Sequence, residues 1–273
     1  MTARTNVHRA RLYKLASLAF DRPTEEVEEA LTTGEFAEQL LESAAALADE
    51  GGADDLRERA EAVVADCPED PDGVDDLYSS YSSLFGFERG GDVAQYELAY
   101  APGTLVVNTN ELADIAGFYE AFGLSVADGN RDRVDHLPTQ LEFCSHLALQ
   151  AAYLELDEDE TGLEIVTDAG GAFVEDHLGR WIPRFRETVH EETDAAFYRA
   201  LANLVDALVS FDADRFGVEP RPYQETGSSP TDAFLGDDDG ADFRCGTCGL
   251  SSSEPNPSQG EPQMPMGDRN GPY

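Results

Sequence analysis

The sequence predicts an all-α protein, and three observations lead to this prediction. Apolar residues recur at intervals of three and four over most of the first 211 positions, which is the spacing of amphipathic helices. Glycine and proline residues interrupt this periodicity, as expected between successive helices. Only one run, Leu105-Val106-Val107, has the composition of a β-strand, and it is too short to form a sheet.

The N-terminal half of the chain contains five predicted helices and one long loop. The first helix covers residues 7–20 and stops before Pro23, and Thr24 is the expected N-cap of a short second helix. Apolar positions at helical spacing predict three further helices, at 36–47, 56–64 and 74–85. Residues 86–103 show no periodicity. A loop of this length inside a domain is usually either functional or disordered.

The C-terminal half contains four more predicted helices. One begins at an Asn108 or Thr109 cap and ends at Gly123, and a long, well-buried one extends to Leu156. The next runs from about residue 163 to 189, with a weak or kinked point at Gly170-Gly171. The last begins at Thr193 or Asp194.

The start of the long helix is the stretch around which the other elements are arranged. Asp135 is the expected N-cap, and Pro138 is tolerated in the first turn because its missing N–H would have no partner there. Asp135, Glu142 and His146 are expected to lie roughly in line, since seven residues bring a helix almost back to the same angle. Two interpretations remain open at this point, a capped core helix and a binding site.

The composition of the chain changes after about Val218. Proline, glycine, serine and aspartate dominate, and large apolar residues are scarce. Such a segment cannot bury enough apolar surface to offset its ordering entropy. We therefore predict an all-α domain at residues 1–218 and a largely disordered acidic tail at 219–273.

The charge of the chain excludes some partners. With 56 acidic against 18 basic residues, the formal net charge is −38, which argues against nucleic-acid binding. Two explanations of this acidity are open. The acidic residues either keep the protein soluble in the molar salt of a halophilic cytoplasm, here called the halophilic coat, or form a surface that attracts a basic partner. The even distribution of the acids favours the halophilic coat. Neither a membrane-length apolar run nor an export signal is recognisable, so we expect a cytoplasmic protein.

The motif content favours a protein without catalytic activity or cofactor. We find no nucleophile elbow, P-loop, dinucleotide fingerprint or H-E-x-x-H pair. Cys245 and Cys248 have the spacing of a metal or redox pair, but a structural zinc site normally needs four ligands. They are weak metal candidates, and an unoccupied dithiol is the simpler interpretation.

Several segments, taken in order, resemble the TorD/DmsD/NarJ-type cytoplasmic chaperones of molybdenum oxidoreductases. The matching segments, spread over residues 9–211, are Arg11-Leu12-Tyr13 through Pro23, Tyr81-Ser82-Ser83-Leu84-Phe85-Gly86, Tyr96-Glu97-Leu98-Ala99-Tyr100, Asp135-His136-Leu137, Leu141-Glu142-Phe143, His177-Leu178-Gly179-Arg180-Trp181 and Phe197-Tyr198. Leu98, Val134 and the cysteine-bearing tail depart from the family pattern.

The resemblance implies a TorD-like helical bundle that acts as a chaperone and is not an enzyme. Such a protein binds the twin-arginine signal peptide of a molybdopterin-containing oxidoreductase and holds the apoenzyme until its cofactor is inserted. The resemblance places six residues near the peptide groove, Tyr96, Glu97, Tyr100, Asp135, His136 and Glu142. It leaves open both a monomer and a homodimer. The alternatives are a helical scaffold or regulator with another partner and, less favoured, a metal-dependent hydrolase.

Overall fold

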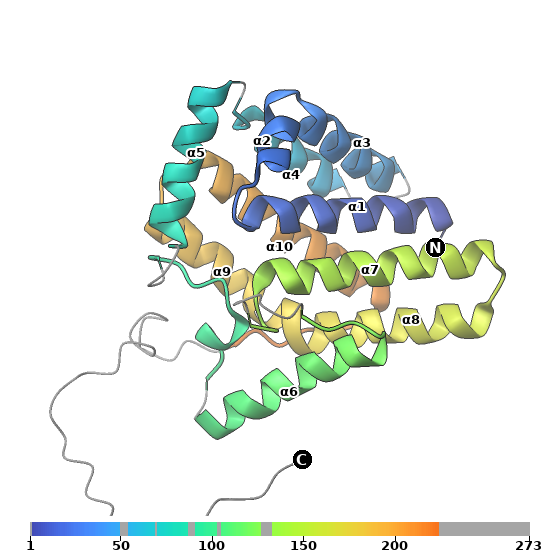
Figure 1. Cartoon of the computed structure of the whole chain (residues 1–273). Helices are drawn as coiled ribbons and strands as arrows, with labels where there is room; N and C mark the ends of the chain where they lie inside the picture. The colour runs from blue at the N-terminus through green and yellow to red at the C-terminus, as the bar shows by residue number, and fades with distance from the viewer. Residues whose placement is uncertain are drawn as a thin grey trace, which may run out of the picture. The chain divides into compact units, whose positions relative to one another are not determined.

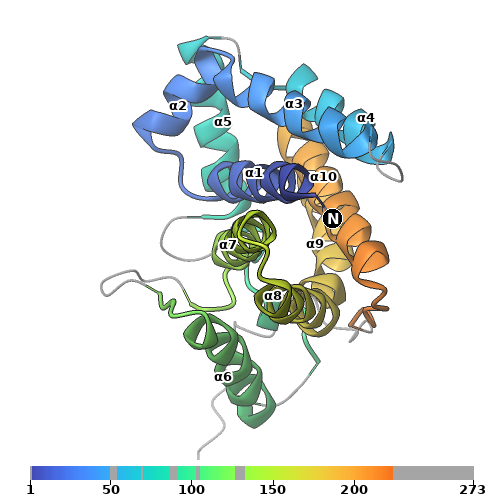
Figure 2. The same ribbon diagram turned by 90° about the vertical axis from the view of Figure 1, so that its right-hand side faces the viewer.

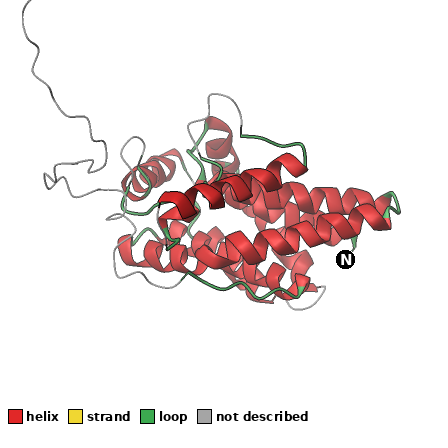
Figure 3. Cartoon of the chain, turned by 90° about the horizontal axis from the view of Figure 1, so that it is seen from below, coloured by secondary structure: helices red, strands yellow, loops and turns green. Residues whose placement is uncertain are grey.

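The helical class is confirmed by the computed structural model, which describes residues 2–49, 54–68, 70–86, 91–102, 105–126 and 133–223. These residues form helices joined by loops and contain no strand, only one isolated antiparallel bridge between Tyr96 and His136 (Figure 3). No described helix is both long enough and apolar enough to span a lipid bilayer.

The elements follow one another as α1 (Ala3–Phe20), α2 (Glu25–Thr32), α3 (Glu35–Asp49), α4 (Asp54–Ala65), α5 (Pro71–Leu84), the 3-10 helix η1 (Glu97–Ala99), α6 (Leu105–Ala121), α7 (Leu137–Leu156), α8 (Glu160–Phe173), the π-helix η2 (Val174–Leu178), α9 (Gly179–Glu192) and α10 (Ala196–Phe216).

Several helix ends follow from local sequence. The Thr24 hydroxyl accepts a hydrogen bond from the Val27 amide at the start of α2, as predicted. Gly123 after α6 and Gly217 after α10 have φ angles of +71° and +70°, a backbone conformation that glycine adopts without steric cost.

Helices α1 and α7 lie side by side, and α7 forms a hairpin with α8 (Figures 1 and 2). The pairing of α1 with α7 is antiparallel, because Ser17 donates to the Pro138 carbonyl near one end and Ser145 donates to the Ala10 carbonyl further along. Large side chains from most of the helices fill the core between them, among them Trp181, Tyr13, Tyr198, Phe20, Phe173 and Phe185.

A buried ion pair joins the two ends of the described chain. The Arg9 guanidinium on α1 donates to both carboxylate oxygens of Asp212 on α10, at 2.7 and 2.6 Å. Tyr13 donates to the same carboxylate at 2.9 Å, and Asn6 accepts from Arg9 at 2.9 Å. The sequence alone did not indicate this pair, whose members are 203 residues apart.

The strand-like interpretation of residues 105–107 is wrong, because α6 begins at Leu105. Asn108 and Thr109 therefore lie inside the helix and do not cap it. An isolated extended segment would leave its backbone N–H and C=O groups without partners, whereas the helix pairs them internally.

The interruption expected at Gly170-Gly171 lies three residues further along, in the π-helix η2. The two glycines leave room for the side chain of Phe216 on α10. A Cβ atom would lie 3.1 Å from this side chain if added at Gly170 and 3.3 Å from it if added at Gly171. The last helix also begins slightly later than predicted, at Ala196, and the Thr193 hydroxyl accepts a hydrogen bond from the Ala195 amide.

The segment after α10 lies against the helical domain as far as it is described. The Tyr223 amide donates to the Arg180 carbonyl at 2.9 Å, and the Arg180 guanidinium lies 4.3 Å from the centre of the Tyr223 ring. Residues 224–273 lie outside the described residues, so the predicted disordered tail and the boundary at 218/219 remain predictions.

Two truncated proteins test this boundary. A protein ending at Tyr223 keeps all the contacts described for Tyr223, and we expect its melting temperature to match that of the full chain. A protein ending at Val218 should keep its helical circular dichroism but lose about 1–3 kcal/mol of unfolding free energy, because Tyr223 donates to a buried carboxylate. Equal melting temperatures for the two truncated proteins would contradict the expectation.

Candidate functional site

A buried carboxylate, Glu97 in η1, lies at the centre of the candidate site. Its side chain has no exposed surface and accepts hydrogen bonds from three side chains. Gln140 Nε2 donates to Oε2 at 2.5 Å, while His177 Nδ1 and the Tyr223 hydroxyl donate to Oε1 at 3.2 and 2.9 Å. Trp181 Nε1 in turn donates to Gln140 Oε1 at 3.0 Å, which orients the amide. We call Glu97, Gln140, His177 and Tyr223 the Glu97 cluster.

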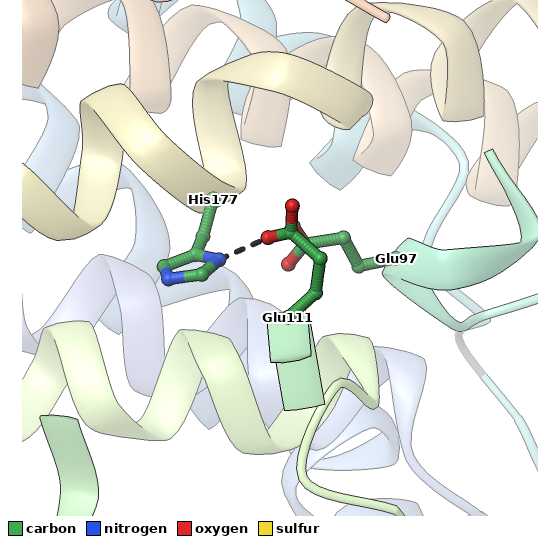
Figure 4. Close-up of side chains that lie close together, drawn as sticks. All are labelled: Glu97, Glu111 and His177. Carbon is green, nitrogen blue, oxygen red and sulfur yellow. Dashed lines mark hydrogen bonds and ion pairs between the residues drawn. The ribbon is translucent and has the colours of Figure 1, made fainter. Parts of the chain in front are cut away.

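Two further acids of α6 surround the imidazole of His177. Asp114 Oδ2 lies 3.5 Å from His177 Nε2, and Glu111 lies on the same side of the ring as Glu97 (Figure 4). Burial alone would lower the pKa of His177, but the hydrogen bond to Glu97 and the negative charges of Glu97, Asp114 and Glu111 together raise it. The ring therefore tends to hold its proton and to balance the buried carboxylate.

Among the described residues, one group has ligand atoms close enough to hold a metal ion. It consists of Glu97, Glu111 and His177, whose ligand atoms lie within 4.8 Å of one another. Both oxygens of Glu97 already accept hydrogen bonds, and the raised pKa of His177 supplies a positive charge beside them. A cation bound at this position would have to displace these hydrogen bonds. The predicted weak metal candidates, Cys245 and Cys248, lie outside the described residues.

The structure corrects the predicted role of Asp135. His136, not Asp135, is the N-cap residue of α7, and its side chain does not cap the helix. The Asp135 carboxylate instead accepts from Arg133 at 2.8 and 2.6 Å and from the Leu98 amide at 3.1 Å. Burial raises the pKa of Asp135, although the Arg133 charge opposes this shift. At the helix start, the Leu137 amide donates to the Gln95 carbonyl at 2.8 Å, and Pro138 has no N–H that would need a partner.

Tyr96 and His136 lie beside this ion pair. Their rings stack with centroids 5.0 Å apart, and the Arg133 guanidinium lies 5.1 Å from the centre of the Tyr96 ring. The Glu97 amide donates to the Asp135 carbonyl at 3.1 Å, which joins η1 to the start of α7. Four of the predicted residues, Tyr96, Glu97, Asp135 and His136, thus form one contiguous unit.

Tyr100 belongs to the core next to this unit. Its ring stacks on Trp181 with centroids 5.4 Å apart, and its hydroxyl donates to the Ala94 carbonyl at 2.9 Å. Burial raises the pKa of Tyr100, so the phenol remains protonated.

Glu142 lies apart from the other five predicted residues. It projects from the exposed face of α7 and forms an ion pair with Lys14 of α1. Glu142 and His146 line one groove, as their spacing predicts, whereas Asp135 precedes the helix and does not lie in line with them. This groove has a volume of about 430 Å³, and its walls include Tyr119, Leu124, Val126, Phe143 and Leu149.

Sequence reasoning missed several members of the site. The sequence did not connect His177 with Glu97. Gln140 is a polar residue on the apolar face of α7, which is the signal that could have identified it. Tyr223 lies beyond the predicted domain boundary. Arg133 has no distinguishing pattern, because its role depends on the turn that brings it onto Asp135.

The comparisons with known proteins agree on one family. Residues 45–187 match the model of the nitrate reductase delta subunit family, and this range contains all six predicted site residues and His177. A chaperone protein TorD of Photobacterium profundum is 29% identical over 138 residues, which is 50% of this chain and 62% of the relative.

Two other relatives are named for the enzymes they assemble. A selenate reductase assembly chaperone protein of Thauera selenatis is 34% identical over 45% of this chain and 65% of the relative. A chlorate reductase assembly chaperone protein of Ideonella dechloratans is 32% identical over 42% of this chain and 57% of the relative. The chain thus spans less than two thirds of the length of each of these relatives. Because the family model covers more than half of the chain, the protein belongs to the nitrate reductase delta subunit family.

Proposed function

We propose that this protein is a cytoplasmic, non-catalytic chaperone for the assembly of a molybdopterin-containing oxidoreductase, and that it binds the twin-arginine signal peptide of that enzyme. Membership of the family carries the proposal, because the matched range contains all six predicted site residues. The names of the selenate and chlorate reductase chaperones support the class of client.

The six residues contribute in two ways in this proposal. Glu142 is exposed at the rim of an apolar groove, so it can contact the peptide while apolar side chains of the peptide enter the groove. The other five residues support the structure around the groove, because their contacts hold η1 against the start of α7; they are Tyr96, Glu97, Tyr100, Asp135 and His136. The groove depends on the same region, since Tyr119 lines the groove and its hydroxyl donates to the Val134 carbonyl at 2.8 Å.

Calorimetric titration with a synthetic twin-arginine signal peptide of a molybdopterin-containing oxidoreductase from the same organism tests the function. We expect a dissociation constant in the micromolar range or below, measured in molar salt with the full chain. A peptide with both arginines replaced by glutamine is the control and should bind at least about tenfold more weakly, because it loses the charge-assisted hydrogen bonds. Absence of heat at about 100 µM peptide, equivalent to binding weaker than about −5.5 kcal/mol, would contradict the proposal.

A further inference from the structure

The exposed face of α7 carries an apolar stripe on an otherwise strongly acidic protein. Leu149, Tyr153 and Leu156 are 51, 66 and 76% exposed, and their spacing of four and three residues places them on one side of the helix. Among the described residues, only two other large hydrophobic side chains, Val7 and Ile165, are exposed. We call Leu149, Tyr153 and Leu156 the α7 ridge.

The ridge continues into the groove beside Glu142. Leu149 belongs to both, because it also lines the groove. Helices α1 and α7 are antiparallel and are joined by the ion pair of Lys14 with Glu142. Val7 lies two helical turns before Lys14 and Leu149 two turns after Glu142, so the antiparallel pairing places these two side chains next to each other. An apolar track therefore extends from the groove along α7 to Leu156.

The far end of the track is acidic. Leu156 is followed by the turn between α7 and α8, where Asp157, Glu158, Asp159 and Glu160 are all exposed. Asp159 caps α8 through the Gly162 amide. Asp157, Glu158 and Glu160 form no ion pair with any basic side chain that the structure describes. Four carboxylates thus adjoin an apolar stripe, an arrangement that complements a cationic segment followed by an apolar one.

We propose that the α7 ridge, the groove and the turn at 157–160 form the docking surface for the twin-arginine signal peptide. The arginines bind the carboxylates of the turn, and the apolar region of the peptide lies along the ridge and ends in the groove. This inference rests on the proposed function and adds the location and the direction of the bound peptide. It differs from the expectation that the peptide lies against the buried residues around Glu97.

The dimensions and charges agree with this occupant. The helical segment from Glu142 to Leu156 is about 21 Å long at 1.5 Å per residue, and the apolar region of a signal peptide, about 7–15 residues, spans up to about 22 Å as a helix. A second copy of this chain fits less well, because it has the same net charge of −38 and would bring a second acidic turn.

Substitution of the ridge by aspartate tests the docking surface. Leu149→Asp and Tyr153→Asp alter exposed side chains, so the melting curves should change little, whereas the affinity for the peptide should fall at least about tenfold. Ile165→Asp is the matched control, because Ile165 on α8 is 59% exposed and lies outside the ridge. Its affinity should equal that of the unmodified protein. Neutralisation of the turn by Asp157→Asn, Glu158→Gln and Glu160→Gln should weaken binding of the native peptide but not of the peptide without arginines.

Chemical labelling provides an independent measurement. Lys14 is the only lysine of the chain and lines the groove, so a bound peptide should slow its acetylation severalfold, as read by mass spectrometry of proteolytic fragments. The same labelling without peptide is the reference.

The outcomes separate the location of the peptide from the function. If the unmodified protein binds the peptide and the two ridge variants bind it equally well, the docking surface is wrong and the proposed function stands. If the unmodified protein does not bind the peptide, both are wrong. If light scattering shows a dimer that Leu149→Asp or Tyr153→Asp disrupts while peptide binding is unaffected, the ridge binds a second copy and the inference is overturned.

Discussion

Replacement of Arg9 by methionine is expected to lower the free energy of unfolding by about 3–5 kcal/mol, because it leaves the Asp212 carboxylate buried without its cation. The side chains of Arg9 and Asp212 are only 5 and 1% exposed. After the substitution, the Tyr13 hydroxyl would be the one remaining donor to this carboxylate among the side chains that the structure describes. For a domain of this size, each kcal/mol corresponds to about 2–4 °C in melting temperature, so a decrease of roughly 6–20 °C is expected in thermal denaturation.

The control is the exposed ion pair between Arg11, which lies on α1 like Arg9, and Glu42 on α3. Its side chains are 33 and 61% exposed, so Arg11→Met should change the unfolding free energy by less than about 1 kcal/mol. The double variant Arg9→Met with Asp212→Leu should recover most of the loss, because two apolar side chains leave no buried charge. A loss below about 1 kcal/mol for Arg9→Met alone would show that the pair is not essential to the packing of α1 on α10.

Replacement of Glu97 by alanine is expected to cost about 3–5 kcal/mol, since it removes the acceptor for three donors and leaves the His177 charge without its buried partner. The same variant should change the pH dependence of stability. The pKa of His177 is raised above its ordinary value of 6.5, so the folded protein keeps a proton that the unfolded chain has lost. This contribution to stability is complete below about pH 6.5 and disappears as the pH rises through the raised pKa.

The measurement is urea denaturation at a series of pH values from 5.5 to about 9. The unmodified protein should lose stability over the upper part of this range, and both Glu97→Ala and His177→Gln should reduce that loss. His146 is the control histidine, because burial lowers its pKa, so His146→Gln should not reduce the loss of stability above about pH 6.5. A profile that stays the same in His177→Gln would show that another group causes the pH dependence.

The sequence by itself determined the features that depend on local periodicity. The all-α class, the Thr24 cap, the end of α6 at Gly123 and the extent of α7 to Leu156 follow from helical spacing and from residues that begin or end a helix. The order of the quoted segments predicted the family, which the match over residues 45–187 confirms. The strand-like run at 105–107 misled because three residues carry too little periodic information to separate a strand from the first turn of a helix.

Only the tertiary structure decided which polar side chains meet. Asp135 has the residue type of an N-cap, yet it is buried against Arg133 and the Leu98 amide because η1 packs on the start of α7. Glu97 and His177 are 80 residues apart, and Glu97 and Tyr223 are 126 apart. Helical periodicity specifies which face of each helix is apolar, but not which helices pack together. The partners of a buried charge depend on that packing, so these pairings appear only in the folded structure.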